Sequence, residues 1–362
     1  MGGPGDFFVT ASPIADPADE TVPNARRLWP RLLIGVALAV VVASALALFA
    51  DARELGRTLQ GFPWWLAAPV LGLTLFNYLL RWVKWELYLR ALGVEGVDKP
   101  TSGLIFLSGF SLSVTPGKAG EIIKGVLLRR VTGTPLTRST AILAAERISD
   151  GMAMLILAGV GLVQFSQARP LLVIAAAGAL GAALVLQRPT LAMAALARLE
   201  GLPVIGPRLH HAKDFLDASG VLVRPRLLLA SVALGTVSWF GECVAFFLIL
   251  DGLGIPASGH LLLVATFVLA VSSIAGAMSL LPGGLGVAEA SVAGMLLALV
   301  DDAAMARSVA AAATLLIRFA TLWFAVLLGA VALAIVYRRL AAREARAPVA
   351  PSEAPVLRPR QG

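Results

Sequence analysis

The segment with most bearing on the architecture of this chain reads SVTPGKAGEIIKGVLLRR, residues 113–130. It breaks a long apolar run with Thr-Pro-Gly and adds three charged side chains before a basic pair. Proline removes a backbone donor and glycine permits unusual dihedral angles, so a continuous helix is not expected through this point. A second apolar run is broken in the same way by SLLPGGLGVAE, residues 279–289.

The composition indicates a membrane protein. Of the 362 residues, 58% are hydrophobic and 14% are charged, whereas soluble domains are usually about half apolar and a quarter charged. A helix needs ~20 apolar residues to cross hydrocarbon, so we expect an all-α polytopic membrane protein with about six full transmembrane helices. Two re-entrant hairpins, each broken by Pro-Gly, complete the expected fold as an inverted repeat. The expected full spans are residues 32–50, 63–89, 138–163, 170–187, 227–250 and 308–337.

The positive charges favour one orientation in the membrane. The formal net charge is +8, but the basic side chains lie mostly in short loops and tails, where they orient a membrane protein rather than bind nucleic acid. A cytoplasmic N-terminus with two re-entrant hairpins places Arg129, Arg130 and Arg138 inside, whereas a single kinked span would place them outside. We therefore expect a multi-pass protein of the cell membrane with both termini in the cytoplasm. Two short full spans instead of a hairpin would give the same orientation.

The chain divides into one membrane domain and two tails. The tails lack hydrophobic periodicity, so disordered cytoplasmic segments are expected at 1–28 and 341–362. The transmembrane domain is expected at 29–340, and its inverted halves at 51–187 and 226–340. Residues 188–225 mix apolar and charged side chains, which is typical of an amphipathic linker at the membrane surface.

Tryptophans are expected to mark the two interfaces of the second span. Trp64 and Trp65 precede its apolar part, and Trp82 and Trp85 lie near its other end. Because tryptophan is enriched at membrane–water interfaces, this pattern predicts that the span begins outside and ends inside.

The two broken segments have matching patterns. Pro116 and Gly120 are followed by an acid, and Pro282 and Gly286 are followed by another. Each segment leads to a long span with one arginine that we expect to be buried, Arg147 in the first half and Arg318 in the second. Paired, Gly/Pro-interrupted segments in corresponding halves indicate the central site of a transporter. The alternative is that both are ordinary kinks, because glycine and proline are common in membrane helices.

The pattern predicts a site for a phosphate-bearing headgroup. Each break starts a new half-helix whose first N–H groups have no helical partner and lie at the positive end of the helix dipole. Such a helix terminus binds anions, and arginine binds phosphate oxygens through two parallel hydrogen bonds. The predicted binding residues are Thr115, Gly117, Lys118, Gly120, Glu121, Glu146, Arg147, Asp150, Gly283, Gly284, Gly286, Glu289 and Arg318.

Structural ion pairs are the alternative explanation of the buried charges. Arg147 and Asp150 are three residues apart and would lie on one helical face. Arg318 has no acid within four residues, so it needs a more distant partner, for which Glu289 is the candidate. Glu146, Asp150 and Glu242 are either proton carriers or structural, and the sequence does not separate these roles.

Three motifs give a family resemblance. TPGKAGEIIKGVLLRR, AERISD and SLLPGGLGVAEASV resemble the lysylphosphatidylglycerol synthase transmembrane (flippase-like) family, which includes the membrane half of the bacterial multiple peptide resistance factor. The resemblance covers residues 30–340 and implies movement of an anionic-lipid derivative across the bilayer. The bifunctional relatives carry a soluble aminoacyl-transfer domain after the membrane part, and here a tail follows instead, so lysyl-lipid synthesis is not expected. The motif positions carried over are Pro116, Gly117, Gly120, Glu121, Glu146, Arg147, Pro282, Gly283, Gly286 and Glu289.

Together these observations predict a transporter, not an enzyme, for a phospholipid derivative or a lipid-linked intermediate. No cofactor or metal is expected, because the single cysteine and the three histidines do not have the spacing of metal ligands. The expected partners are membrane lipids, with envelope glycolipid or lipid-modifying enzymes and a second copy of the chain as further candidates. The alternatives are a membrane enzyme that transfers groups between lipid carriers and an accessory subunit of a glycolipid-synthesis complex.

Overall fold

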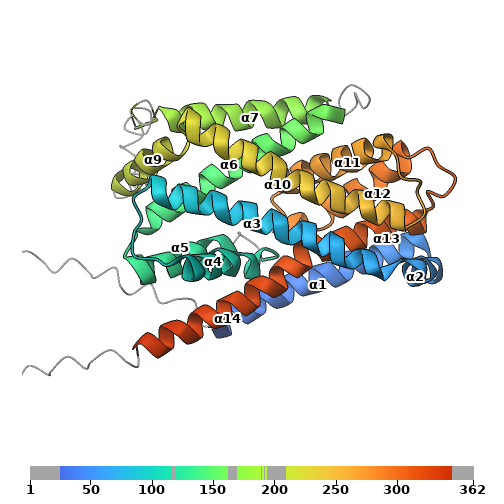
Figure 1. Ribbon diagram of the computed structural model, residues 1–362, viewed down its shortest axis with the longest axis horizontal. Helices are drawn as coiled ribbons and strands as arrows, with labels where there is room; N and C mark the ends of the chain where they lie inside the picture. Colours follow the sequence, from blue (N-terminus) through green and yellow to red (C-terminus); the bar gives the residue numbers. More distant parts are fainter. Residues whose placement is uncertain are drawn as a thin grey trace, which may run out of the picture.

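The computed structural model describes residues 25–115, 119–161, 169–188, 190, 192–193 and 209–344, and the ordered elements in these residues are all helices (Figure 1). In chain order they begin with α1 (Ala25–Ala50), α2 (Ala52–Gly61), α3 (Ala67–Ala91), α4 (Lys99–Ser108), α5 (Ala119–Thr132) and α6 (Leu136–Gly161). They continue with α7 (Arg169–Gln187), α9 (Leu209–Leu222), α10 (Pro225–Gly252), α11 (Gly259–Met278), α12 (Val287–Leu299), α13 (Arg307–Arg318) and α14 (Phe324–Glu344). The predicted all-α fold is confirmed.

Six helical segments are long and apolar enough to cross a membrane: Trp64–Ala91, Arg169–Gln187, Pro225–Gly252, Gly259–Met278, Pro282–Leu299 and Arg307–Ala342. Four of them match predicted full spans, at 63–89, 170–187, 227–250 and 308–337. The second broken segment supplies two of the six, while α6 is long enough but carries charges in its middle. The polytopic membrane fold is therefore confirmed, and re-entry of the hairpins stays a prediction.

Much of the predicted tails and part of the linker lie outside the described residues. Helix α1 begins at Ala25 and α14 ends at Glu344, so both helices extend into the predicted tails. The described part of the linker includes α9, which buries Leu216, Ala218 and Leu222. This buried face packs against α6 and α7.

Both breaks predicted from Pro-Gly interrupt the helical path. Helix α4 is followed by a short 3-10 turn, η3 (Gly109–Leu112), and α5 begins only at Ala119. Helix α11 ends at Met278, and the 3-10 turn η7 (Pro282–Gly284) precedes α12. In the second break Gly283, Gly284 and Gly286 have φ angles of 60°, 66° and 88°. Residues with a side chain rarely adopt these angles, so glycine is required to turn the chain here.

The two helix pairs enter the bundle from opposite ends and meet at their tips. We call α4, η3 and α5 the first hairpin, and α11, η7 and α12 the second hairpin. In Figure 1 the first hairpin enters from the left and the second from the right. A Cβ atom built on Gly283 would lie 3.6 Å from the backbone oxygen of Ser113, so the tips are in contact.

The long helices repeat one packing pattern in both halves. Helices α3 and α10, which precede the hairpins, pack against each other. Helix α6 contacts α5 of the first hairpin and α11 of the second, while α13 contacts α12 and α14 contacts α4 and η3. The helix that follows each hairpin thus crosses onto the other hairpin, and these crossings join the halves. The half boundaries at 51–187 and 226–340 stay a prediction.

Glycines allow the closest of these crossings. A Cβ on Gly329 of α14 would lie 2.3 Å from the backbone nitrogen of Ser111 in η3. A Cβ on Gly161 of α6 would lie 2.5 Å from the ring of Phe267 in α11. At Gly329 the neighbouring atoms belong to the backbone, which cannot move aside as a side-chain end can.

The tryptophan prediction was wrong for Trp85. Its side chain is 1% exposed, and its Nε1–H donates to the Ser102 hydroxyl at 3.2 Å. The residue belongs to the core between α3 and α4 and does not mark an interface. Trp64 and Trp65, in contrast, are exposed.

We expect Gly329→Ala to lower the free energy of unfolding by about 1–3 kcal/mol, because the added methyl group would overlap the backbone of η3. Denaturant unfolding of the purified protein in detergent measures the change. Gly294→Ala in α12 is the matched control, because no atom lies within 4 Å of the added Cβ. Equal stability of the two variants would contradict the tight crossing of α14 on η3.

Candidate functional site

A cavity of about 270 Å³ lies where the hairpin tips meet. Gly109 and Ser113 line it from the first hairpin, and Gly283 and Gly284 line it from the second. Helices α3, α6, α10, α13 and α14 supply the remaining walls. Ligand pockets usually measure about 300–1,000 Å³, so this cavity is of the size for a headgroup and not for a whole lipid.

Positive charge dominates the lining of the cavity. Four basic residues, Arg81, Lys124, Arg147 and Arg318, line it, and the acidic residue among the described lining residues is Glu242. Charges at membrane depth are costly and face a polar interior or an ion pathway. The arrangement therefore favours an anionic ligand.

Arg318 holds the second hairpin at its turn. Its Nε–H donates to Glu289 Oε1 at 2.5 Å, and its Nη2–H donates to the Gly283 carbonyl at 2.7 Å. The other oxygen of Glu289 accepts the Gly286 N–H at 2.6 Å, which caps the start of α12. The ion pair suggested by the sequence is present. Because Glu289 uses the Gly286 N–H, that donor is not open to a headgroup.

A π-helical turn follows Arg318 directly. In η8 (Phe319–Trp323) the helix widens, and the Phe324 N–H bonds to the Phe319 carbonyl, five residues back. The hydroxyl of Tyr78 on α3 donates to the Thr321 carbonyl at 2.7 Å. Single π turns are frequent at functional sites. The span expected at 308–337 is one uninterrupted helical segment that widens into this π turn beside the cavity.

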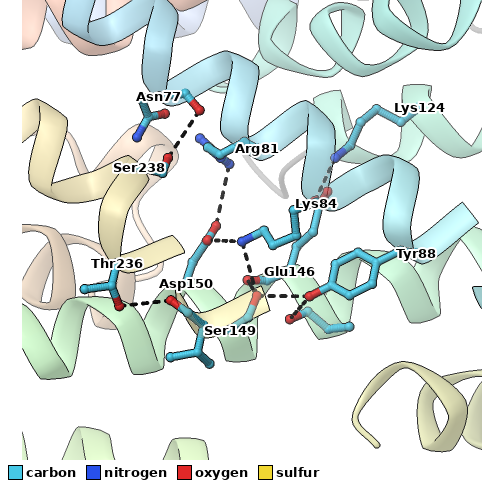
Figure 2. Close-up of polar contacts among 12 residues, drawn as sticks. Asn77, Arg81, Lys84, Tyr88, Lys124, Glu146, Ser149, Asp150, Thr236 and Ser238 are labelled. Atoms are coloured by element: carbon cyan, nitrogen blue, oxygen red, sulfur yellow. Dashed lines mark hydrogen bonds and ion pairs between the residues drawn. The ribbon is translucent and has the colours of Figure 1, made fainter. Parts of the chain in front are cut away.

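Asp150 pairs with two cations of α3. Figure 2 shows Lys84 hydrogen-bonded to the Asp150 carboxylate and Arg81 above the same carboxylate, and the Arg81 guanidinium lies 3.7 Å from Oδ2. Lys84 also donates to the Ser149 hydroxyl at 3.2 Å, and that hydroxyl lies 3.1 Å from the hydroxyl of Tyr88. The Arg147–Asp150 pair suggested by the sequence stays a prediction. A charged network joins α3 to α6.

Glu146 pairs with the first hairpin. Lys124 Nζ on α5 donates to Glu146 Oε2 at 2.8 Å (Figure 2). The same ammonium lies 5.0 Å from the ring centre of Trp85 and 5.3 Å from that of Phe106, within the range of a cation–π contact. A Cβ on Gly109 would lie 2.6 Å from the Lys124 side chain, so glycine at 109 makes room for this lysine. Lys124 is therefore held in place at the cavity wall.

The predicted site residues separate into groups. Those that line the cavity are Arg147, Gly283, Gly284 and Arg318. A second group forms ion pairs with basic residues at the cavity or next to it: Glu146 with Lys124, Asp150 with Lys84, and Glu289 with Arg318. Gly117 and Lys118 lie outside the described residues, and Gly120 and Glu121 are described only as backbone positions in α5.

One expectation about an individual residue needs correction. Arg147 was expected to be buried, but its side chain is exposed and contributes to the lining of the cavity. Thr115 stays a predicted binding residue and is not among the described lining residues. Its hydroxyl donates to the Leu112 carbonyl at 2.8 Å, and the side chain is 1% exposed, so it stabilises the end of η3.

Sequence reasoning missed three cations of the site, Arg81, Lys84 and Lys124. It named Glu242 as a proton carrier or a structural acid, but did not place it in the site. Arg81 and Lys84 lie beside Trp82 and Trp85, for which the sequence predicted a membrane interface, and neither cation was named as a candidate. Their spacing of three residues, which places both on one helical face, was the available signal. Glu242 stands alone in an apolar helix, which is itself a sign of function in a membrane protein.

Comparison with known proteins gives two findings. The family described as "Lysylphosphatidylglycerol synthase TM region" matches the chain over residues 32–329. The chain is also similar to "Glycosyltransferase AglD" of Haloferax volcanii, with 27% identity over 132 residues. That similarity covers 36% of this chain and 21% of the relative, so the chain spans only about a fifth of the relative's length.

We expect Arg318→Gln to lower the free energy of unfolding by about 3–5 kcal/mol, because Glu289 would stay buried without its cation. Glu289→Gln should also destabilise, and the double variant should lose less than the sum of the two single losses. Denaturant unfolding in detergent measures all three, with Arg307→Gln, an exposed arginine at the start of α13, as the control. Strictly additive losses would contradict a coupled pair.

Proposed function

The chain belongs to the family of the lysylphosphatidylglycerol synthase TM region, and on this basis we propose that it is a transporter for an anionic lipid. The cargo would be a phosphate-bearing phospholipid derivative or a lipid-linked intermediate, moved across the cytoplasmic membrane. Its headgroup would occupy the cavity between the hairpin tips while its acyl chains remain in the bilayer. The chain itself would carry out no covalent chemistry.

The observation that carries this proposal is the charge of the cavity. Four basic residues line it against one acid among the described lining residues. Arginine supplies parallel N–H donors that match phosphate oxygens, and lysine supplies a point charge. Arg81, Lys124 and Arg318 are each fixed by an acid outside the lining, at Asp150, Glu146 and Glu289. The donors are thus held in place before a ligand arrives.

The contacts between the halves support alternating access. The cavity lies at the junction of the two hairpins, which enter from opposite ends of the bundle (Figure 1). In transporters built from inverted repeats, rocking of one repeat against the other exposes a central site to either side of the membrane. Here such rocking would open the cavity first to one side of the membrane and then to the other, while the headgroup stays bound between the hairpin tips.

A second candidate function is group transfer between lipid carriers, which the similarity to a protein named as a glycosyltransferase favours. This reaction needs acids and bases that face the headgroup. Glu146, Asp150 and Glu289 are engaged in ion pairs and do not line the cavity. Their positions support a structural role, and this favours transport over transfer. An accessory role in a glycolipid-synthesis complex would instead require a stable partner.

The proposed orientation predicts where single cysteines react. Pro135 lies in the loop between α5 and α6 and Ala303 in the loop between α12 and α13, and both residues are exposed. The two loops lie at opposite ends of the bundle (Figure 1). In a Cys243→Ala background we expect a cysteine at 135 to react only from the cytoplasm and a cysteine at 303 only from outside. Labelling of intact cells with a membrane-impermeant maleimide measures this. Reaction of the two positions from the same side would refute the inverted arrangement.

Transport itself is tested with purified protein in liposomes that contain a phosphatidylglycerol with a fluorescent headgroup. We expect the wild-type protein to move the lipid, as measured by loss of protection from an external quencher. Arg147→Gln should slow this movement about tenfold or more, because a hydrogen bond to a charged group contributes about 1.5–3 kcal/mol. The residue lines the cavity and its side chain is exposed, so the fold should be retained.

The matched control is Arg138→Gln, an exposed arginine at the start of the same helix. Wild-type rates in the Arg147 variant would refute the proposed site. Absence of movement in folded wild-type protein, together with glycosyl transfer to a lipid acceptor by the same preparation, would favour the second candidate function.

A further inference from the structure

Glu242 is an unusual acid in this structure. It lies in the middle of α10, is 3% exposed, and lines the cavity. It makes no hydrogen bond or ion pair within the described part of the chain, whereas Glu146, Asp150 and Glu289 are all paired. A buried carboxyl group without a partner in a membrane protein marks an ion or proton pathway.

Charged groups surround Glu242 from several packed helices. Arg81 and Arg318 are near enough to attract a negative charge at Glu242, and Asp150 is near enough to repel it. Helix α11 contributes hydroxyl groups to the cavity, and η2 (Trp64–Leu66) contributes no titratable side chain. The titratable and charged groups that face or adjoin Glu242 are Tyr78 and Arg81 on α3, Lys124 on α5, Arg147 and Asp150 on α6, Cys243 on α10, and Arg318 with its partner Glu289 on α13 and α12.

An ionised Glu242 and a bound phosphate would compete for the same cations of the cavity. An ionised Glu242 would present one negative charge to the same guanidinium groups that a bound phosphate would use. Two like charges in one site oppose each other, so occupancy by the phosphate favours the neutral form of the carboxyl group. The reverse also holds, because coupling between two binding sites is reciprocal.

We infer that Glu242 is the proton-binding site of this transporter and that binding of the anionic headgroup is coupled to uptake of one proton. The inference rests on the proposed function. The proton comes from water and forms an O–H bond with the Glu242 carboxylate, and no other covalent bond changes. Lipid and proton then occupy the cavity together and cross in the same direction, so a proton gradient supplies the driving force.

Binding is measured first, with dihexanoyl phosphatidylglycerol as the probe and the full chain in detergent. This phosphodiester keeps its single charge between about pH 5.5 and about pH 7.5, a range in which buried carboxyl groups titrate. The wild-type protein should bind the probe about tenfold more tightly at the lower pH, within the usual range of coupling between two sites. It should also take up a proton on binding in weakly buffered solution at the higher pH.

Glu242→Gln imitates the neutral carboxyl group with nearly the same shape. We expect it to bind the probe at the higher pH as tightly as the wild-type protein does at the lower pH, and without proton uptake. Glu95→Gln, an exposed acid between α3 and α4, is the control and should behave as wild type. Thermal unfolding confirms that each variant is folded.

Three outcomes overturn the inference. Unchanged pH dependence in Glu242→Gln would assign the proton to another group. Weaker binding by this variant at both pH values would mean that the carboxylate contacts the ligand. Absence of binding by the wild-type protein at either pH would refute the phosphate site itself, and with it the proposed function.

The liposome assay distinguishes failure of the proton coupling from failure of the proposed transport function. With a pH gradient across the membrane, the wild-type protein should accumulate the labelled lipid in one leaflet, and Glu242→Gln should only equilibrate it. Equilibration without accumulation in both proteins would leave the proposed function standing and refute the proton coupling.

Discussion

A charge or an open helix end inside hydrocarbon must find its partner within the protein, because no water is available there. Both hairpins create such ends in the middle of the bundle. At the second break the guanidinium group of Arg318 provides these partners. It donates to the Gly283 carbonyl and to the carboxylate of Glu289, which caps α12. The cavity lies beside this turn, because Gly283, Gly284 and Arg318 all line it.

The first hairpin meets the same requirement by different means. Its cation, Lys124, is neutralised by the following span through Glu146 and lies over aromatic rings of α3 and α4. Asp150, one turn further along α6, forms ion pairs with Lys84 and Arg81 of α3 (Figure 2). The two acids, Glu146 and Asp150, thus lie outside the lining of the cavity, whereas their cationic partners lie in the lining or next to it. This layering gives the cavity its positive potential at a modest cost in buried net charge.

The sequence predicted those features that depend on short-range backbone chemistry. The Pro-Gly pairs predicted both breaks. Because Arg318 has no acid nearby in the sequence, a distant partner was expected, and Glu289 was the candidate. The sequence did not reveal the pairing of Asp150, because that depends on which face of α3 meets α6, and two tryptophans suggested an interface instead. The π turn after Arg318 has no local signal, since the hydroxyl of Tyr78, distant in sequence, binds the Thr321 carbonyl. Exposure of Arg147 depends on the cavity itself, which only the assembled hairpins create.

The two glycine crossings have a mechanical consequence. Gly161 brings the first half against Phe267, and Gly329 brings the second half against the backbone of η3. Each crossing ties a span of one half to the hairpin of the other, and neither leaves room for an added side-chain atom without displacement of its neighbour. A rigid body pinned at two points keeps one rotational degree of freedom, about the line that joins them. Relative motion of the halves that preserves both contacts is therefore a swivel about that line, and neither sliding nor separation is compatible with it.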